Sequence, residues 1–374
     1  MFTLTKKEDV EDFVRGTTFF GTGGGGGPQK GLQLLLNDFK NGKKLGWKDI
    51  SELEGELWSV CPVSVGSISP ETEEIKKKKE AIGFTKKTIV NPLINAVVEL
   101  EKYTGKKAEL IVAAELGGGN TPGPMDVAVN LNRILVDGDY TGRASPESVQ
   151  STAYLFGKNV PPVSAVDAYG DVIIIKDAIN TDVLERIGKF ISEATYGLAE
   201  AGRFLELKDL KKVIIPGTLT ESFEIGKAVR LARENGKDPV EAITEKTHGY
   251  LLFEGKVSDK KWEDQEGYTV GTFTFTGENK FSQKEFKIWF KNENHISWLN
   301  GEVYVTSPDV IEVVRRKDGE PTTNTDLNVG EKVAIIGTKG RDVYRTEEGL
   351  NVFGPRHFGF DYKYVPIEKV MKNR

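Results

Sequence analysis

A run of glycines near the N-terminus constrains this chain more than any other feature. Residues 19–31 read FFGTGGGGGPQKG, so Gly21 and the five consecutive glycines 23–27 leave the backbone almost without side-chain cover. Pro28 and apolar residues at helical spacing follow, which predicts a helix that begins directly after the loop. Backbone N–H groups at a helix start bind anions, because they lack partners and lie at the positive end of the helix dipole. We therefore expect this loop to hold an anion or a developing oxyanion rather than to act as a flexible linker.

The composition is that of a globular protein. The 374 residues suffice for two domains, and 38% hydrophobic with 29% charged residues excludes a disordered chain. The net charge of −5 argues against nucleic-acid binding. The N-terminus has charges where a signal peptide is apolar, and no segment reaches the roughly 18 apolar residues of a membrane helix, so we expect a cytoplasmic protein without membrane contact. Abundant lysine and glutamate with little glutamine is typical of a heat-adapted source.

Helical and strand patterns predict an α/β architecture followed by a β-rich unit. Helices are expected at 7–14, 29–40, 88–103, 126–131, 146–156, 182–204 and 220–235, and strands at 57–65, 110–114, 134–136, 172–175 and 213–215. From about residue 250, short strands separated by glycine and polar turns indicate a sandwich-like or barrel-like unit. We predict an N-terminal α/β domain with glycine-rich loops over 1–166. The predicted C-terminal domain, 167–374, has an α/β segment to about 249 and a β-rich unit over 250–374.

A second glycine loop follows the strand expected at 110–114. It reads Glu115-Leu-Gly-Gly-Gly-Asn120 and comes at the carboxyl end of that strand, where ligands bind in open α/β sheets. A carboxylate and an amide beside bare backbone can supply a general base, an orienting group and oxyanion donors. The alternative is a plain strand-to-helix turn capped by Asn120.

Acidic residues and the few histidines define the other candidates. Asp137 and Asp139 form an i, i+2 pair that could hold a divalent metal or share a proton, although such pairs also occur in solvated loops. His357 stands in the turn GPRHFG, and imidazole transfers protons near neutral pH. The single cysteine, Cys61, excludes an internal disulfide and a cysteine-based zinc site, and its apolar neighbours indicate an inert core thiol.

A nucleotide cofactor is not expected. The first loop formally fits the dinucleotide fingerprint from Gly21 to Gly26, but consecutive glycines satisfy many patterns by accident. The residues before it, 17–20, make only a weak strand candidate, and no lysine with serine or threonine follows as a phosphate-binding loop requires. The cofactor therefore stays open, with a divalent metal on Asp137 and Asp139 as the candidate.

Seven motifs occur along the chain in a defined order. They are GTGGGG-P, E-GGGN, D-x-D-x-x-GRA-x-PE, PGTL with IGKAV, FEGKV, PDVIEVV and GPRHFGFDYKYVP. Together they resemble the S-methyl-thiohydantoin desulfurase family, whose members are often labelled hydantoinase-associated, and the resemblance covers nearly the whole chain. It implies an N-terminal α/β domain, a C-terminal part with a β-rich unit, and hydrolysis of a C–S bond on a hydantoin-like ring with release of a thiol.

Residue chemistry then predicts how such a hydrolase would work. Displacing a thiol requires activated water, donors for negative charge on the ring, and a group that holds the substrate. The predicted catalytic residues are Glu115, Asp137, Asp139 and His357. The predicted substrate-binding residues are Gly23, Gly24, Gly25, Gly26, Gly118, Gly119, Asn120, Arg143 and Arg356, where either arginine could bind a substrate carboxylate.

The expected partner is a small heterocyclic substrate, and the chain is expected to form a homo-oligomer. Two other interpretations stay open: a non-catalytic partner or regulatory subunit of a hydantoinase-type assembly, and a small-ligand sensor.

Overall fold

A mixed seven-stranded sheet forms the centre of the N-terminal α/β domain in the computed structural model, which describes residues 1–66, 72–158 and 160–372. The strand order is β7-β6-β8-β3-β4-β5-β9, with β3, β4 and β5 parallel and the other pairs antiparallel. The strands are β3 (Trp58–Val65), β4 (Leu110–Ala113), β5 (Ile134–Asp139), β6 (Val163–Val166), β7 (Val172–Ile175), β8 (Leu198–Glu206) and β9 (Ile215–Pro216). Because β7, β8 and β9 follow residue 166, this sheet draws on chain beyond the predicted first domain, and the division at 166 stays a prediction.

Helices cover both faces of this sheet. Alternate residues of a strand point to opposite faces, and in β4 the residues on both faces are apolar. Ile111 of β4 packs into the core beneath α1, α2, α4, α5 and α9, whereas Leu110 and Val112 pack on the other face, against α6 and α8. Cys61 is buried in this second core, as predicted. The helices are α1 (Lys7–Phe20), α2 (Pro28–Lys40), α3 (Glu73–Ala81), α4 (Pro92–Thr104), α5 (Pro122–Asn130), α6 (Thr152–Leu155), α7 (Thr181–Thr195), α8 (Leu207–Val213), α9 (Thr218–Glu234) and α10 (Pro239–Thr247).

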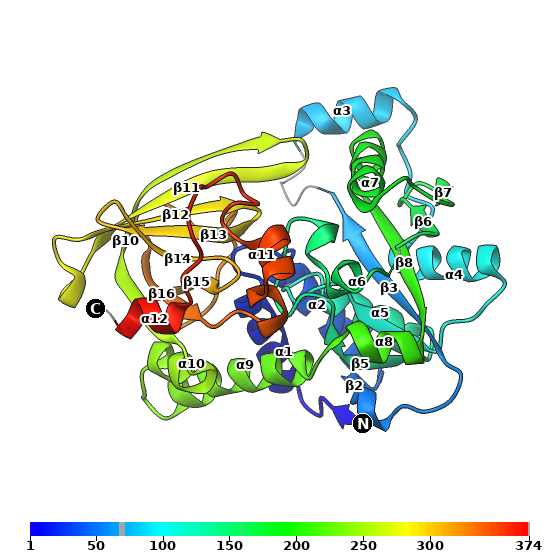
Figure 1. Cartoon of the computed structure of the whole chain (residues 1–374). Helices are drawn as coiled ribbons and strands as arrows, with labels where there is room; N and C mark the ends of the chain where they lie inside the picture. Colours follow the sequence, from blue (N-terminus) through cyan, green and yellow to red (C-terminus); the bar gives the residue numbers. More distant parts are fainter. Residues whose placement is uncertain (67–71, 159, 373–374) are drawn as a thin grey trace.

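The C-terminal part is an antiparallel sheet curled into a half-barrel, which confirms the predicted β-rich unit (Figure 1). Its order is β14-β13-β12-β11-β10-β16-β15. Alternation along β12 places Phe286, Ile288 and Phe290 in the core and leaves Trp289 and Lys291 on the other face. The strands are β10 (Tyr250–Gln265), β11 (Tyr268–Gly277), β12 (Glu285–Lys291), β13 (Glu293–Leu299), β14 (Glu302–Thr306), β15 (Val310–Arg315) and β16 (Lys332–Thr338).

Short elements complete the fold. Near the N-terminus β1 pairs antiparallel with β2, and α11 lies between the two sheets in Figure 1. These elements are β1 (Phe2–Thr3), β2 (Gly46–Trp47), the 3-10 turns Ile50–Glu52, Ser148–Gln150, Asn279–Phe281 and Asp342–Arg345, and the helices α11 (Glu347–Phe353) and α12 (Ile367–Lys372). In the described ranges no helix combines the length and the apolar character that a bilayer crossing needs.

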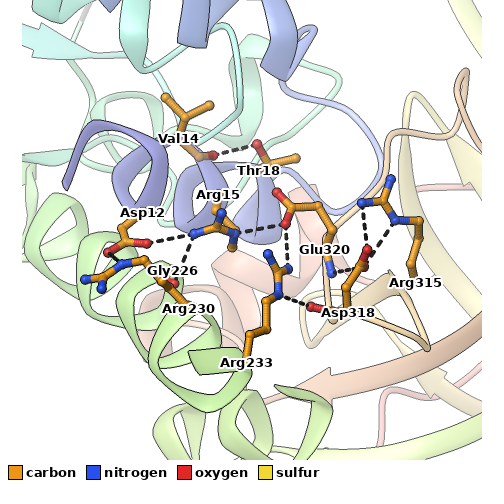
Figure 2. A network of polar contacts seen from close by, with 10 residues as sticks. All are labelled: Asp12, Val14, Arg15, Thr18, Gly226, Arg230, Arg233, Arg315, Asp318 and Glu320. Atoms are coloured by element: carbon orange, nitrogen blue, oxygen red, sulfur yellow. Dashed lines mark hydrogen bonds and ion pairs between the residues drawn. The ribbon is translucent and has the colours of Figure 1, made fainter. Parts of the chain in front are cut away.

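Helices α1 and α9 cross at two glycines and fix the base of the first glycine loop. A Cβ on Gly16 would lie 1.6 Å from the Ser222 carbonyl oxygen, and one on Gly226 would lie 1.8 Å from that of Asp12. Figure 2 shows the ion pairs beside this crossing, where buried Asp12 accepts from Arg15 and Arg230. Larger side chains at these glycines would force the helices apart.

The same network ties the helices to the C-terminal sheet. Glu320, which follows β15, accepts from Arg15 at 3.0 Å and from Arg233 of α9 at 2.6 Å (Figure 2). The helix that ends at the glycine loop is therefore anchored to both halves of the molecule.

Several predicted elements differ from the structure. Of the strand predicted at 213–215, Val213 ends helix α8 and only Ile215 pairs, as part of β9. The helix predicted over 146–156 is divided into the 3-10 turn Ser148–Gln150 and α6. Residues 17–20, considered as a strand, are the last turn of α1. The helix predicted over 182–204 ends at Thr195, because Tyr196 is left-handed (φ 58°) and Gly197 follows; residues 198–206 then pair with β3 as strand β8. Tertiary pairing with β3 thus overrides the helical pattern of residues 198–204.

Candidate functional site

The two predicted glycine loops meet in space. The backbone N–H groups of Gly119 and Asn120 donate to the Gly25 carbonyl oxygen at 3.1 and 3.0 Å. A Cβ on Gly25 would lie 2.6 Å from the Gly117 Cα, so this approach requires bare backbone. The Gly119 amide is thereby occupied inside the protein. Among the described residues the Gly26 and Gly27 amides have no hydrogen-bond partner, and they lie half-buried at the start of α2.

The C-terminal domain closes the other side of the first loop. Asn294 donates its backbone N–H to the Thr22 carbonyl oxygen at 2.8 Å, and Asn324 donates to that of Gly23 at 2.7 Å. The Glu293 carboxyl packs directly on Gly24, where an added Cβ would lie 1.9 Å from its Oε1. The glycine loop therefore lies between the two domains.

Glu115 lies at the edge of this junction with its carboxylate oriented by two donors. Its Oε1 accepts from Asn120 Nδ2 at 2.7 Å, and its Oε2 accepts from the backbone N–H of Ser145 at 2.8 Å. Burial raises the pKa of Glu115 to about 7, against the lowering effect of these two hydrogen bonds, and the nearby Asp139 also raises it. A carboxyl with this pKa can accept and return a proton near neutral pH, and the catalytic role of Glu115 stays a prediction.

Arg143 lies beneath the loop and is buried. It donates to Thr22 Oγ1 at 2.9 Å and to the carbonyl oxygens of Asn294 (3.0 Å), Ala144 (3.0 Å) and Asp309 (3.3 Å). Burial lowers its pKa to about 10, against the raising effect of nearby carboxylates. Its donors are directed at protein oxygens that join the two domains, so a role for Arg143 in binding a substrate carboxylate stays a prediction.

Two buried glutamates of the C-terminal sheet, Glu293 and Glu312, face this junction and were not among the predicted site residues. Burial raises the pKa of Glu293 well above its usual value, and the proximity of Glu115 adds to that, while the N–H groups of Glu293 itself and of Gly25 and the charge of Arg143 oppose it. Burial likewise raises the pKa of Glu312 well above the usual range. Burial thus favours the uncharged form of both carboxyls. The sequence signal for Glu312 is a charged residue inside the apolar strand VIEVV.

Asp137 and Asp139 lie on β5, and their carboxylates accept hydrogen bonds from backbone N–H groups nearby. Asp137 Oδ1 accepts from the backbone N–H groups of Leu219 and Thr220 at the start of α9, and Asp139 Oδ1 accepts from those of Thr141 and Gly142 at 2.6 Å. Over the described ranges no group of three or more His, Cys, Asp or Glu side chains could hold a metal ion. These contacts order the chain after β5, and catalytic or metal-binding roles for both residues stay predictions.

In the described part of the chain, no hydrogen bond or ion pair joins His357 or Arg356 to the glycine loops. His357 Nε2 bonds Glu147 Oε2, whereas Arg356 is exposed and pairs with Asp361 at 3.1 Å. The structure thus brings together Gly23, Gly24, Gly25, Gly26, Gly118, Gly119, Asn120, Glu115 and Arg143. His357 belongs to a neighbouring cluster, which is described below.

The α/β domain and the curled β-sheet thus enclose the meeting point of the two glycine loops. The S-Me-THD-like N-terminal domain matches residues 8–177, and the S-Me-THD-like C-terminal domain matches residues 180–367. The chain therefore belongs to the S-Me-THD-like family, as its motifs indicated.

One solved structure shares the whole fold. A crystal structure of a protein from Chromobacterium violaceum is 20% identical in sequence, superposes with a TM-score of 0.78, and is matched over 98% of this chain and 100% of that one. Among proteins with curated functions, none matches.

Proposed function

We propose that this protein is a hydrolase that acts on an S-methyl-thiohydantoin or a similar hydantoin-like ring, adding water and releasing a thiol. Family membership supports the ring class. The observation that carries the proposal is the meeting of the two glycine loops beside Glu115, a carboxylate with two fixed donors and a pKa of about 7.

In the proposed reaction, water adds to the ring carbon that bears sulfur. Glu115 takes a proton from the water as its oxygen bonds to that carbon, and the ring C=N electrons move to nitrogen, which takes the proton back from Glu115. Glu115 then removes the remaining hydroxyl proton, the C–S bond breaks, and the proton passes to the sulfur. One water proton ends on the ring nitrogen and the other on the thiol, and the ring gains a carbonyl oxygen.

Backbone donors would stabilise the negative charge that develops during this addition. The Gly26 and Gly27 amides suit this role, because they lack partners among the described residues and lie at the N-terminus of α2. Burial of Glu293 favours its uncharged form, which limits the negative charge beside Glu115.

The test is thiol release by the purified chain from S-methyl-thiohydantoin, measured with a thiol-reactive dye, with the oxygenated ring identified by mass spectrometry. Glu115→Gln should lower kcat by about 10²–10⁴-fold, the usual contribution of a positioned general base. Glu99→Gln on the surface of α4 is the control and should retain full activity. No thiol release by the unaltered chain, or full turnover by Glu115→Gln, would contradict the proposal.

A further inference from the structure

A groove of about 500 Å³ opens beside the His357 cluster, on the outer face of the C-terminal sheet. Its lining includes Tyr268 and Val270 of β11, Trp289 of β12, and Phe358 of the turn that follows α11. The volume lies in the range of small-molecule pockets, which combine apolar walls with a few placed polar groups. The groove is thus large enough for a five-membered or six-membered ring and its substituents.

Aromatic side chains form a fixed corner of this groove. Trp289 points outward because its neighbours Phe286, Ile288 and Phe290 fill the core. The Phe358 ring stacks on buried His295, with centroids 3.9 Å apart, and lies 5.8 Å from the Trp289 ring at an interplanar angle of 58°. Rings held in this way present flat surfaces to a planar ligand without losing further side-chain entropy on binding.

The polar wall is a glutamate–histidine pair. Glu147 bonds His357 Nε2 with one carboxylate oxygen and the Lys291 ammonium with the other. Burial alone would raise the pKa of Glu147, but these two partners outweigh it and lower the pKa to about 2. The carboxylate is therefore an acceptor only, so Nε2 carries the proton in neutral His357.

This tautomer leaves the other imidazole nitrogen as an acceptor. Among the described residues no partner is found for His357 Nδ1. The groove therefore offers one oriented acceptor and flat aromatic walls, a combination that suits a planar ring with its own N–H donor.

The groove adjoins the glycine-loop site through two short stretches of chain. Ser145 bonds Glu115, and two residues later Glu147 bonds His357. Lys291 lines the groove and pairs in register with Glu293, which packs on Gly24. Two segments of three residues, 145–147 and 291–293, thus connect the groove with the glycine-loop site.

We infer that this groove binds a planar nitrogen heterocycle, which stacks on the Trp289–Phe358 corner and donates a ring N–H to His357 Nδ1. The inference deepens the proposed function, on which its choice of a hydantoin-class ring rests. Glu147 is a positioning residue that fixes the histidine tautomer, and Lys291 holds its other oxygen.

The test measures binding of hydantoin, and of 1,3-dimethylhydantoin, which has no ring N–H, by titration calorimetry. Glu115→Gln serves as the host protein for the binding experiments, so that the result does not depend on turnover. Hydantoin should bind about three- to tenfold more tightly than the dimethyl compound, the difference expected for one hydrogen bond. This comparison requires no change in the groove and so does not depend on the folding of a variant.

Variants then locate the site. Trp289→Leu and His357→Phe should each weaken hydantoin binding by about three- to tenfold. Trp262 is exposed on β10 and lies outside the groove, so Trp262→Leu should leave the hydantoin affinity within about twofold of the unaltered value. Equal affinity for both compounds, unchanged binding in the Trp289 and His357 variants, or no hydantoin binding would overturn the inference. Binding as expected without thiol release would instead refute the proposed hydrolysis and leave the groove assigned.

Discussion

Replacing Gly25 by alanine tests the contact between the glycine loops directly. Gly25 has φ 73°, a left-handed conformation, and a Cβ there would lie 2.6 Å from the Gly117 Cα and 3.0 Å from the Leu116 carbonyl oxygen. Since both neighbours are backbone atoms, no side-chain rotation can relieve the overlap. The loops must separate, and the two hydrogen bonds to the Gly25 carbonyl oxygen must lengthen or break.

The expected cost follows from these contacts. An alanine in the left-handed region costs about 1–2 kcal/mol, and each lost backbone hydrogen bond costs about 1 kcal/mol. Gly25→Ala should therefore lower the free energy of unfolding by roughly 3–4 kcal/mol. Thiol release should fall as well, because Asn120, which orients Glu115, follows Gly119 in the displaced loop.

Gly27→Ala is the matched control. Gly27 has φ −72°, an ordinary value for any residue, and nothing lies within 4 Å of its added Cβ. Its cost should stay below about 1 kcal/mol, the usual scale for a helix N-cap. The measurement is the midpoint and slope of urea unfolding for each variant, monitored by intrinsic fluorescence. Midpoints within error of each other for the two variants would refute the assignment of the Gly25 contact.

Three further results are expected. Gly226→Ala should lower stability by at least about 2 kcal/mol in urea unfolding, as overpacking does, because its Cβ would meet the Asp12 carbonyl oxygen at 1.8 Å; a gain, as helix propensity alone predicts, would contradict the tight crossing. Thiol release should rise with pH and level off above about pH 7, since Glu115 with a pKa of about 7 acts as a base only when ionised; a flat profile from pH 5 to 9 would exclude it. Glu320→Gln should cost about 1 kcal/mol, less in high salt, through loss of its ion pairs with Arg15 and Arg233; a salt-independent effect would rule out an electrostatic origin.

Local chemistry made much of the fold predictable from the sequence. Pro28 and the apolar spacing after it located the start of α2 to within one residue, and the buried strand before Glu115 was predicted to within one residue. The predicted helix over 182–204 was wrong beyond Thr195, because strand pairing with β3 is a contact between residues more than a hundred positions apart. Helical spacing is visible in a short window of sequence, and a pairing partner is not.

The same distinction between local patterns and distant contacts applies to the candidate site. The glycines, Glu115 and Asn120 were identified because bare backbone after a strand and before a helix is a local pattern with a chemical meaning. Glu293 was missed, since its role depends on a strand of the other domain that lies against Gly24. The position of His357 beside Glu147 likewise joins residues 210 positions apart.

What the sequence determined by itself is therefore the conformational freedom of two loops and the identity of the acid beside them. The tertiary structure alone decided that these loops touch, that the buried carboxyls of Glu293 and Glu312 face them from the C-terminal sheet, and that burial moves the Glu115 pKa to about 7. The physical reason is that backbone freedom belongs to a residue type, whereas contact and desolvation depend on which distant parts of the chain exclude water together.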